Sequence, residues 1–179
     1  MTVVRALARP LLSTIFIVQG AKAARSPEPL VAKAQPVTDR MVPMIKKVAP
    51  AQVGDRLPDS TANLVRLNGA AQVLGGLALA SGKGRRFGAT LLAASLVPTT
   101  LAGHSFWQET DKAAKATQKI QFMKNLGLMG GLLLAAVDTE GKPGVAWRAR
   151  RAARDVRREA KSLAKQTRLE ARLAKAHLT

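Results

Sequence analysis

The chain has 179 residues, of which 47% are hydrophobic but only 3% are aromatic, and it contains no tyrosine. A soluble core of this size would normally use more aromatic bulk, whereas Ala, Leu, Val and Gly are typical of helices that approach one another closely in lipid. The net charge of +18 predicts an anionic partner, and the absence of cysteine excludes disulfides and thiol redox chemistry. With His104 and His177 as the only histidines, the sequence predicts neither a metal site nor a cofactor.

Four apolar segments predict membrane-spanning helices. In chain order they cover about residues 6–24, 63–81, 87–103 and 118–137. Each is near the lower end of the roughly 17 to 25 residues that a helix needs to cross a bilayer. Pro98 lies inside the third segment, where neighbouring helices or the hydroxyls of Thr99 and Thr100 can satisfy the backbone groups that proline frees. We therefore expect an all-α, integral membrane four-helix bundle over residues 1–140.

The first segment also fits a secretory signal peptide. Arg5 and Arg9 would form its basic region, residues 11–18 its apolar region, and Ala21-Lys22-Ala23 its cleavage site. A lysine inside a cleavage site is unusual. A retained membrane anchor is therefore the preferred interpretation, and a cleaved signal peptide is its alternative.

A proline-rich stretch separates the first two predicted spans. Its six prolines, which exclude one long helix, are Pro27, Pro29, Pro36, Pro43, Pro50 and Pro58. Apolar residues recur at helical spacing between positions 37 and 48. This piece is expected to be either a short amphipathic helix on the outer membrane surface or an irregular loop.

Basic residues are concentrated on one side of the predicted topology. The tail from residue 141 onward has 12 basic and 3 acidic residues, and the turn between the second and third spans has Lys83, Arg85 and Arg86 with no acid. The stretch between the first two spans is more balanced, with six basic and four acidic residues. Because basic loops stay in the cytoplasm, the pattern predicts a multi-pass protein with both termini cytoplasmic.

Residues 141–179 form a basic tail outside the predicted bundle. Its Ala, Arg, Lys and Leu content favours a helix, with a narrow apolar stripe at Val145, Ala152, Val156 and Leu163. Such a helix would bind anionic lipid or a partner protein, and a solvated, partly disordered extension is the alternative. Nucleic acid is an unexpected partner, because four segments are near spanning length and few aromatic residues are available for stacking.

Small residues in the second and fourth spans predict close helix packing. Residues with short side chains, spaced four apart, let helix backbones approach in lipid and would also permit a homo-oligomer. The expected packing glycines are Gly69, Gly75, Gly76, Gly127 and Gly131.

Polar side chains at membrane depth form the candidate site. A charged residue in lipid costs about 2.5 to 3.5 kcal/mol on insertion scales, so it usually faces a bundle interior or water. We expect an outward-facing pocket for an anionic or quinone-like headgroup. Alternatively, the cations extend to the interface and the aromatic residues form an interfacial belt. The candidate ligand-binding residues are Arg66, Asn68, Gln72, His104, Trp107, Lys124 and Asn125. No phosphate-binding loop or pair of intramembrane carboxylates indicates a catalytic residue.

Several sequence elements, taken in order, resemble the DoxX family of bacterial membrane proteins. The resemblance extends from Arg5 to about Asp138, and the proline-rich loop and Ala-rich spans look most like actinobacterial members. It is carried by Asn68-Gly69 with Gln72-Val73-Leu74-Gly75-Gly76, by Gly103-His104-Ser105-Phe106-Trp107, and by Phe122-Met123-Lys124-Asn125-Leu126 with Gly130-Gly131.

The resemblance implies four transmembrane helices in the bacterial plasma membrane and an association with redox enzymes. Family members are linked to quinone-dependent thiosulfate oxidation and to complexes that handle oxidative stress. The expected function is therefore a non-catalytic membrane subunit or anchor for a redox complex, and the alternative is a transporter or binding protein for a small molecule, quinone or lipid. Members often carry a glutamate near the Gly-Gly pair, where this chain has Gln72. A role that needs a carboxylate there is not expected.

Overall fold

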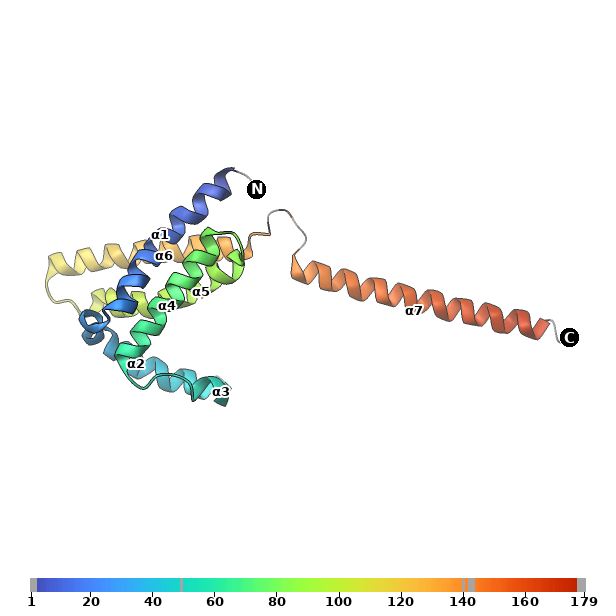
Figure 1. Ribbon diagram of the computed structural model, residues 1–179, viewed down its shortest axis with the longest axis horizontal. Helices are drawn as coiled ribbons and strands as arrows, with labels where there is room; N and C mark the ends of the chain where they lie inside the picture. Colours follow the sequence, from blue (N-terminus) through green and yellow to red (C-terminus); the bar gives the residue numbers. More distant parts are fainter. Residues whose placement is uncertain (1–2, 49, 140, 142–143, 177–179) are drawn as a thin grey trace. The chain divides into compact units, whose positions relative to one another are not determined.

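The computed structural model describes residues 3–48, 50–139, 141 and 144–176. All regular secondary structure within these residues is helical, which confirms the all-α prediction (Figure 1). Parts of the predicted tail, including Lys142 and His177, lie outside the described residues. The helices are α1 (Val3–Arg25), α2 (Glu28–Val48), α3 (Ala51–Gly54), α4 (Thr61–Ala80), α5 (Arg85–Gly103), the 3-10 helix η1 (Phe106–Gln108), α6 (Lys112–Val137) and α7 (Val145–Ala176).

The chain divides into two compact units, Met1–Asp138 and Thr139–Thr179. Within the first unit, α1, α4, α5 and α6 coincide with the four apolar segments. By length and hydropathy, α1 and α6 are the two helices among the described residues that are apolar enough to cross a membrane. Helix α6 begins six residues before the predicted start at 118, because the Asp111 carboxylate caps it by accepting a 2.7 Å hydrogen bond from the backbone N–H of Ala114.

The proline-rich stretch is divided between α2 and α3, so no single helix spans it, as predicted, but α2 continues for 21 residues through Pro36 and Pro43 and begins well before the expected piece at 37–48. Pro29 lies in its first turn, where a backbone N–H has no helical partner to lose. The three prolines are seven residues apart, so they lie on nearly the same side of the helix. The missing hydrogen bonds are thus confined to one side, and the helix survives.

Neighbouring helices of the first unit pack in the order α1, α4, α5, α6, so α4 and α5 are central, and α2 packs across α4 and α5 (Figure 1). Phe16 of α1, Leu79 of α4 and Leu132 of α6 are buried in one core. The remaining core residues come from α5 and are Ala89, Leu92, Ala93 and Leu96. Because the central helices have neighbours on two sides, Gln72 of α4 and Ser95 and Thr100 of α5 are buried between helices.

Glycines allow α4 to approach both of its neighbours. A Cβ atom on Gly69 would lie 2.6 Å from the carbonyl oxygen of Gly20 on α1, and one on Gly88 of α5 would lie 2.5 Å from the carbonyl oxygen of Gly75. A Cβ on Gly76 would meet Ile17 Cγ1 at 2.6 Å. No Cβ-bearing residue fits at Gly69 or Gly88 without a backbone shift, and one at Gly76 would displace the Ile17 side chain, so these glycines set the helix separations.

The glycines of α6 are in a different position from those of α4. A Cβ on Gly127 would meet nothing within 4 Å, and one on Gly131 would touch only the Leu12 side chain at 3.8 Å. Among the described residues, therefore, nothing packs closely against Gly127, and the expected close packing is found at the glycines of α4 instead.

Candidate functional site

Two amide side chains of α4 meet one hydroxyl of α5. Asn68 Nδ2 and Gln72 Nε2 each donate a 3.0 Å hydrogen bond to Thr99 Oγ1. The two amides can share this acceptor because residues four apart lie on the same face of a helix. Thr99 Oγ1 in turn donates to the Ser95 carbonyl oxygen at 2.9 Å, so the hydroxyl uses its donor and both acceptor positions.

The next residue of α5 makes the corresponding link to α6. Asn125 Nδ2 donates to Thr100 Oγ1 at 3.1 Å, and Thr100 is only 3% exposed. Polar groups of three helices are thus joined at one level of the unit. We call this group the amide–threonine cluster, and it consists of Asn68, Gln72, Thr99, Thr100 and Asn125.

The amide–threonine cluster is neutral and contains no carboxylate or imidazole. Its chemistry is therefore hydrogen bonding without proton transfer or nucleophilic attack. The amide nitrogens are used within the cluster, and among the described residues no hydrogen bond reaches the carbonyl oxygens of Asn68 and Gln72. These oxygens would accept hydrogen bonds from a hydroxyl or N–H group of a ligand.

A second set of contacts lies where α5 ends and α6 begins. His104 Nδ1 and Gln118 Oε1 are hydrogen-bonded at 2.8 Å. Beside them, the rings of Phe106, Trp107 and Phe122 contact one another edge to face, with centroids 5.2 to 6.0 Å apart. The histidine and the tryptophan, both predicted site residues, thus hold η1 against α6.

The two cations among the predicted site residues lie elsewhere. Arg66 is exposed, pairs with Glu28 of α2 at 3.2 Å and donates to Asn63 Oδ1 at 3.2 Å. Lys124 lines a shallow, exposed depression on α6 together with Lys119, Ile120 and Met123. Within the described part of the chain, no contact joins Arg66, His104 and Lys124. The structure therefore brings together the predicted amides but not the predicted cations.

At the other end of α5 and α6, arginines from two helices converge on the last turn of α6. The Asp138 carboxylate accepts two hydrogen bonds from Arg5, at 3.0 and 3.3 Å, and lies 3.6 Å from the guanidinium of Arg9. Arg86 Nε of α5 donates to the Ala136 carbonyl oxygen at 2.7 Å. We call Arg5, Arg9, Arg86 and Asp138 the arginine clasp. Arg9 is 7% exposed, although it lies in one of the most apolar helices.

Sequence reasoning missed the clasp and both threonines of the cluster. Arg5 and Asp138 are 133 positions apart, and no local pattern connects them. The threonines were expected only to satisfy backbone groups near Pro98. The sequence did contain a signal for the threonines. They are two adjacent hydroxyl residues in an otherwise apolar segment, and they lie at about the same membrane depth as the two amides of the preceding segment.

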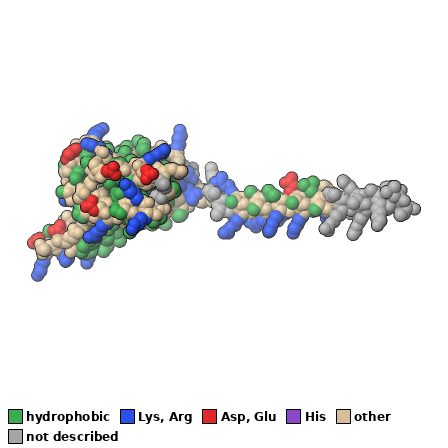
Figure 2. All heavy atoms as spheres, turned by 90° about the horizontal axis from the view of Figure 1, so that it is seen from below, with side chains coloured by type: hydrophobic (Ala, Val, Ile, Leu, Met, Phe, Trp, Pro, Cys, Tyr) green, Lys and Arg blue, Asp and Glu red, His purple; other side chains and the backbone are tan. Residues whose placement is uncertain are grey.

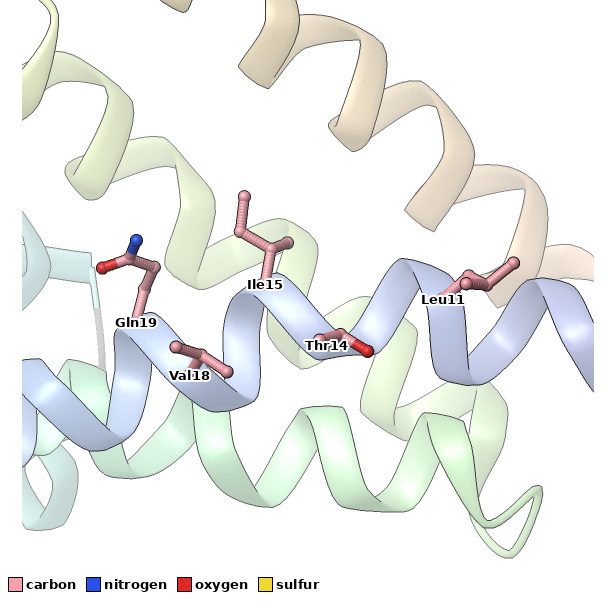
Figure 3. A pocket seen from close by; sticks show the side chains of 5 residues that line it. All are labelled: Leu11, Thr14, Ile15, Val18 and Gln19. Carbon is pink, nitrogen blue, oxygen red and sulfur yellow. The ribbon is translucent and has the colours of Figure 1, made fainter.

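The outward side of α1 carries a shallow depression of about 420 Å³. All of its lining residues come from this one helix and form two rows with a spacing of four (Figure 3). The lining residues are Leu11, Thr14, Ile15, Val18 and Gln19. Such an open, mainly apolar surface suits a hydrocarbon chain better than a polar substrate.

In the second unit, α7 presents different chemistry on its different sides. Lys and Arg side chains gather along one side of its described part, while apolar side chains occupy another (Figure 2). Val156 and Leu163 are the large apolar residues of the stripe, and both are exposed. The Arg151 guanidinium lies 5.2 Å from the ring centroid of Trp147 in a cation–π contact. The tail is thus a helix that has a basic face over residues 147–166.

The first unit also matches a known protein family, since the sequence model of the DoxX family matches residues 4–105. The chain belongs to the DoxX family. The matched region of this DoxX protein runs from α1 to just beyond α5, so α6 with its Lys124-Asn125 element and α7 lie outside it. No curated protein and no solved structure matches the chain. Among the described residues, no group of three His, Asp or Glu side chains could hold a metal ion.

Proposed function

We propose that this DoxX protein is a non-catalytic subunit of the bacterial plasma membrane that anchors a redox or oxidative-stress enzyme at the cytoplasmic surface. The observation that carries the proposal is the second unit, an exposed helix with a basic face joined to an apolar helical unit. A basic helix of this kind suits an acidic protein surface. The proline-rich stretch and the Ala-rich helices favour the actinobacterial type.

We further propose that α1, α4, α5 and α6 all cross the membrane, with both termini in the cytoplasm. Only α1 and α6 contain a stretch that passes the hydropathy test for a span among the described residues, but α4 and α5 are central and their amides and hydroxyls are hydrogen-bonded to each other. Hydrogen bonding of this kind makes polar residues tolerable in lipid. The clasp places the start of α1, the start of α5 and the end of α6 at one end, where basic residues predominate.

The contacts that α1 makes support a first helix that is retained in the mature protein. Residues from α1 provide a close glycine contact of α4 and half of the clasp, and the family match includes α1 from residue 4. A mature chain without α1 would expose Gly69 and would leave Asp138 without Arg5.

The anchor function is tested by purifying the tagged full-length protein from its membranes in mild detergent and identifying what copurifies. Replacing Arg150, Arg154, Arg157 and Lys161 by Gln removes four cations from the basic face of α7 without shortening the chain. The expected result is a stoichiometric redox enzyme with the natural chain and its loss with the variant. As a matched control, Ser162→Ala together with Gln166→Ala alters the other side of α7 and should retain the enzyme. Recovery of the chain alone, or only as a homo-oligomer, would contradict the proposal.

A second function is favoured by the amide–threonine cluster. Its two available carbonyl oxygens would bind the hydroxyl group of a quinol, lipid or other small molecule, in a binding protein or a transporter. Extraction of the purified protein with organic solvent, followed by mass spectrometry, would detect such a ligand. Its loss on replacing Asn68 by Leu, with the redox enzyme absent from both preparations, would favour this function over the anchor.

A further inference from the structure

Helix α2 has a seven-residue repeat that divides part of its surface into three rows. The repeat reads Leu-x-x-Lys-x-x-Pro from position 30, Val-x-x-Arg-x-x-Pro from position 37 and Met-x-x-Lys from position 44. Residues seven apart lie on nearly the same side of a helix, and residues three apart are neighbours on its surface. An apolar row is therefore followed around α2 by a cationic row and then by a proline row. The rows are Leu30, Val37 and Met44, then Lys33, Arg40 and Lys47, then Pro29, Pro36 and Pro43.

The charges on the two sides of α2 differ in whether they are paired. On the side toward the start of α4, Glu28 pairs with Arg66 at 3.2 Å. Lys46, on the same side, pairs with Asp59 at 3.7 Å. The side chains of the cationic row are all exposed, and among the described residues none of them has an ion pair or a hydrogen bond. The cationic row is thus available to an external anion.

Helix α2 lies at the end of the first unit where α4 begins. At the first residue of α4, Thr61 Oγ1 donates a 2.7 Å hydrogen bond to Gln35 Oε1 and lies 3.1 Å from Thr38 Oγ1, so the middle of α2 is fixed there. From this point α2 packs across α4 and α5 (Figure 1). In the proposed topology, on which this inference rests, the start of α4 is at the outer surface of the membrane. Helix α2 then lies along that surface.

We propose that α2 is an interfacial helix that binds anionic phospholipids of the outer leaflet, with its apolar row among the acyl chains and its cationic row at the phosphates. Leu30 is 42% exposed and Met44 is 66% exposed, so the protein leaves much of the apolar row uncovered. Lysine and arginine side chains next to such a row can extend to the level of the headgroups. Apolar burial and attraction to anionic headgroups together hold a helix of this kind in the interface.

The proline row indicates which side of α2 faces water. Pro36 and Pro43 have no N–H group, so the carbonyl oxygens of Ala32 and Asp39 lack the partner that an α-helix normally supplies. A backbone oxygen without a partner is costly in lipid and is readily hydrated at a surface. The prolines are exposed. The orientation that places the apolar row in lipid therefore also leaves these oxygens in water.

The test uses nitroxide labels on single cysteines, which the natural chain lacks. Full-length Met44→Cys and Ala32→Cys, the second on an exposed position away from the apolar row, are placed in vesicles of dioleoyl phosphatidylcholine mixed with dioleoyl phosphatidylglycerol. Collisions of each label with oxygen, which concentrates in lipid, are compared with collisions with a water-soluble nickel complex. The oxygen-to-nickel ratio should be roughly fivefold higher at position 44 than at position 32. Equal ratios would overturn the proposal, and so would a label at position 44 that both reagents fail to reach, since a protein partner such as a second copy would then cover the row.

The cationic row is tested in the Met44→Cys protein by replacing Lys33, Arg40 and Lys47 with Gln. With the natural row, the ratio at position 44 should be roughly twofold higher in the mixed vesicles than in pure phosphatidylcholine, and the triple variant should lose this difference. Lys46→Gln removes a cation from the paired side and is the control that should keep the difference. A difference that is absent with the natural row, or that persists in the triple variant, would overturn the binding of anionic headgroups.

A third label separates this inference from the proposed topology. Leu74, in the interior of α4, is 65% exposed, so a label on Leu74→Cys should give a high ratio when α4 crosses the membrane. A low ratio there would overturn the topology and the inference together. A high ratio at position 74 with a low ratio at position 44 would overturn the role of α2 alone. Because α7 is unchanged in every variant, the outcome does not depend on the redox partner.

Discussion

Helices α4 and α6 carry similar patterns of glycine and leucine, yet the structure uses them differently. Of the 20 residues of α4, six are buried, and three of these are the glycines that contact α1 or α5. Of the 26 residues of α6, Leu132 alone is buried among those described. The difference teaches that small residues four apart permit close packing but do not determine whether a neighbour is present.

The two helices are also held by different forces. Helix α4 is held by close backbone contact on two sides, whereas α6 packs against the core through Leu132, Leu128 and Met129 and is also joined to the rest of the unit by polar groups along its length. These are the His104–Gln118 and Asn125–Thr100 hydrogen bonds and the clasp at Asp138. In lipid, where apolar surfaces gain little from leaving the solvent, such hydrogen bonds and ion pairs can replace packing area.

The largest expected difference in stability is between a methyl group added to a closely packed glycine of α4 and one added to an open glycine of α6. Gly69→Ala would place a Cβ 2.6 Å from a carbonyl oxygen of α1, so we expect a loss of about 3 kcal/mol in the free energy of unfolding or a failure to fold. Gly127→Ala meets open space and should leave stability unchanged or raise it by up to about 1 kcal/mol. Thermal and denaturant unfolding in detergent would compare the two. Equal losses would mean that α6 has an unseen close neighbour, such as a second copy.

A smaller difference in stability is expected between a buried and an exposed leucine of α6. Leu132 is completely buried, whereas Leu134 is 72% exposed. Leu132→Ala should lower the free energy of unfolding by about 2 kcal/mol, because the cavity removes packing contacts. Leu134→Ala should change it by less than about 0.5 kcal/mol. The same unfolding measurement applies, and a large loss from Leu134→Ala would contradict the assignment of that side to lipid.

The smallest effect concerns the polar connection between α4 and α5. Thr99→Val removes the shared acceptor of Asn68 and Gln72, and the expected loss is about 1 to 2 kcal/mol. Thr90 is the matched control, because its hydroxyl is exposed and donates to the Arg86 carbonyl oxygen within its own helix. Thr90→Val should be nearly neutral in unfolding experiments. If both variants behave alike, the cluster contributes nothing to joining the helices.

The helices that could be predicted from the sequence were those with a clear local hydropathy pattern. Hydropathy located α1, α4, α5 and α6 to within a few residues, except at the start of α6, where six polar and small residues from Lys112 continue the helix behind the Asp111 cap. The length of α2 was underestimated, because its prolines at 29, 36 and 43 are seven residues apart and leave the missing hydrogen bonds on one side of the helix.

The candidate site was predictable only where its residues share a helix. The spacing of Asn68 and Gln72 places them on one face of their helix. Their partner Thr99 lies on another helix, and the pairing depends on the axial register between α4 and α5. The Gly75–Gly88 contact fixes that register, and no local pattern reveals it. The clasp depends on a pairing across nearly the whole unit, so it required the fold itself.

The arginine clasp has a consequence for the order in which the chain is made. The carboxylate of Asp138 emerges from the ribosome 133 positions after Arg5, when the glycine contacts between α1, α4 and α5 can already form. In the proposed orientation, the early arginines first retain the N-terminus in the cytoplasm by their charge. Asp138 then ties Arg5 and Arg9 to the final span. One set of residues thereby acts first as an orientation signal in the nascent chain and later as a fastening in the finished protein.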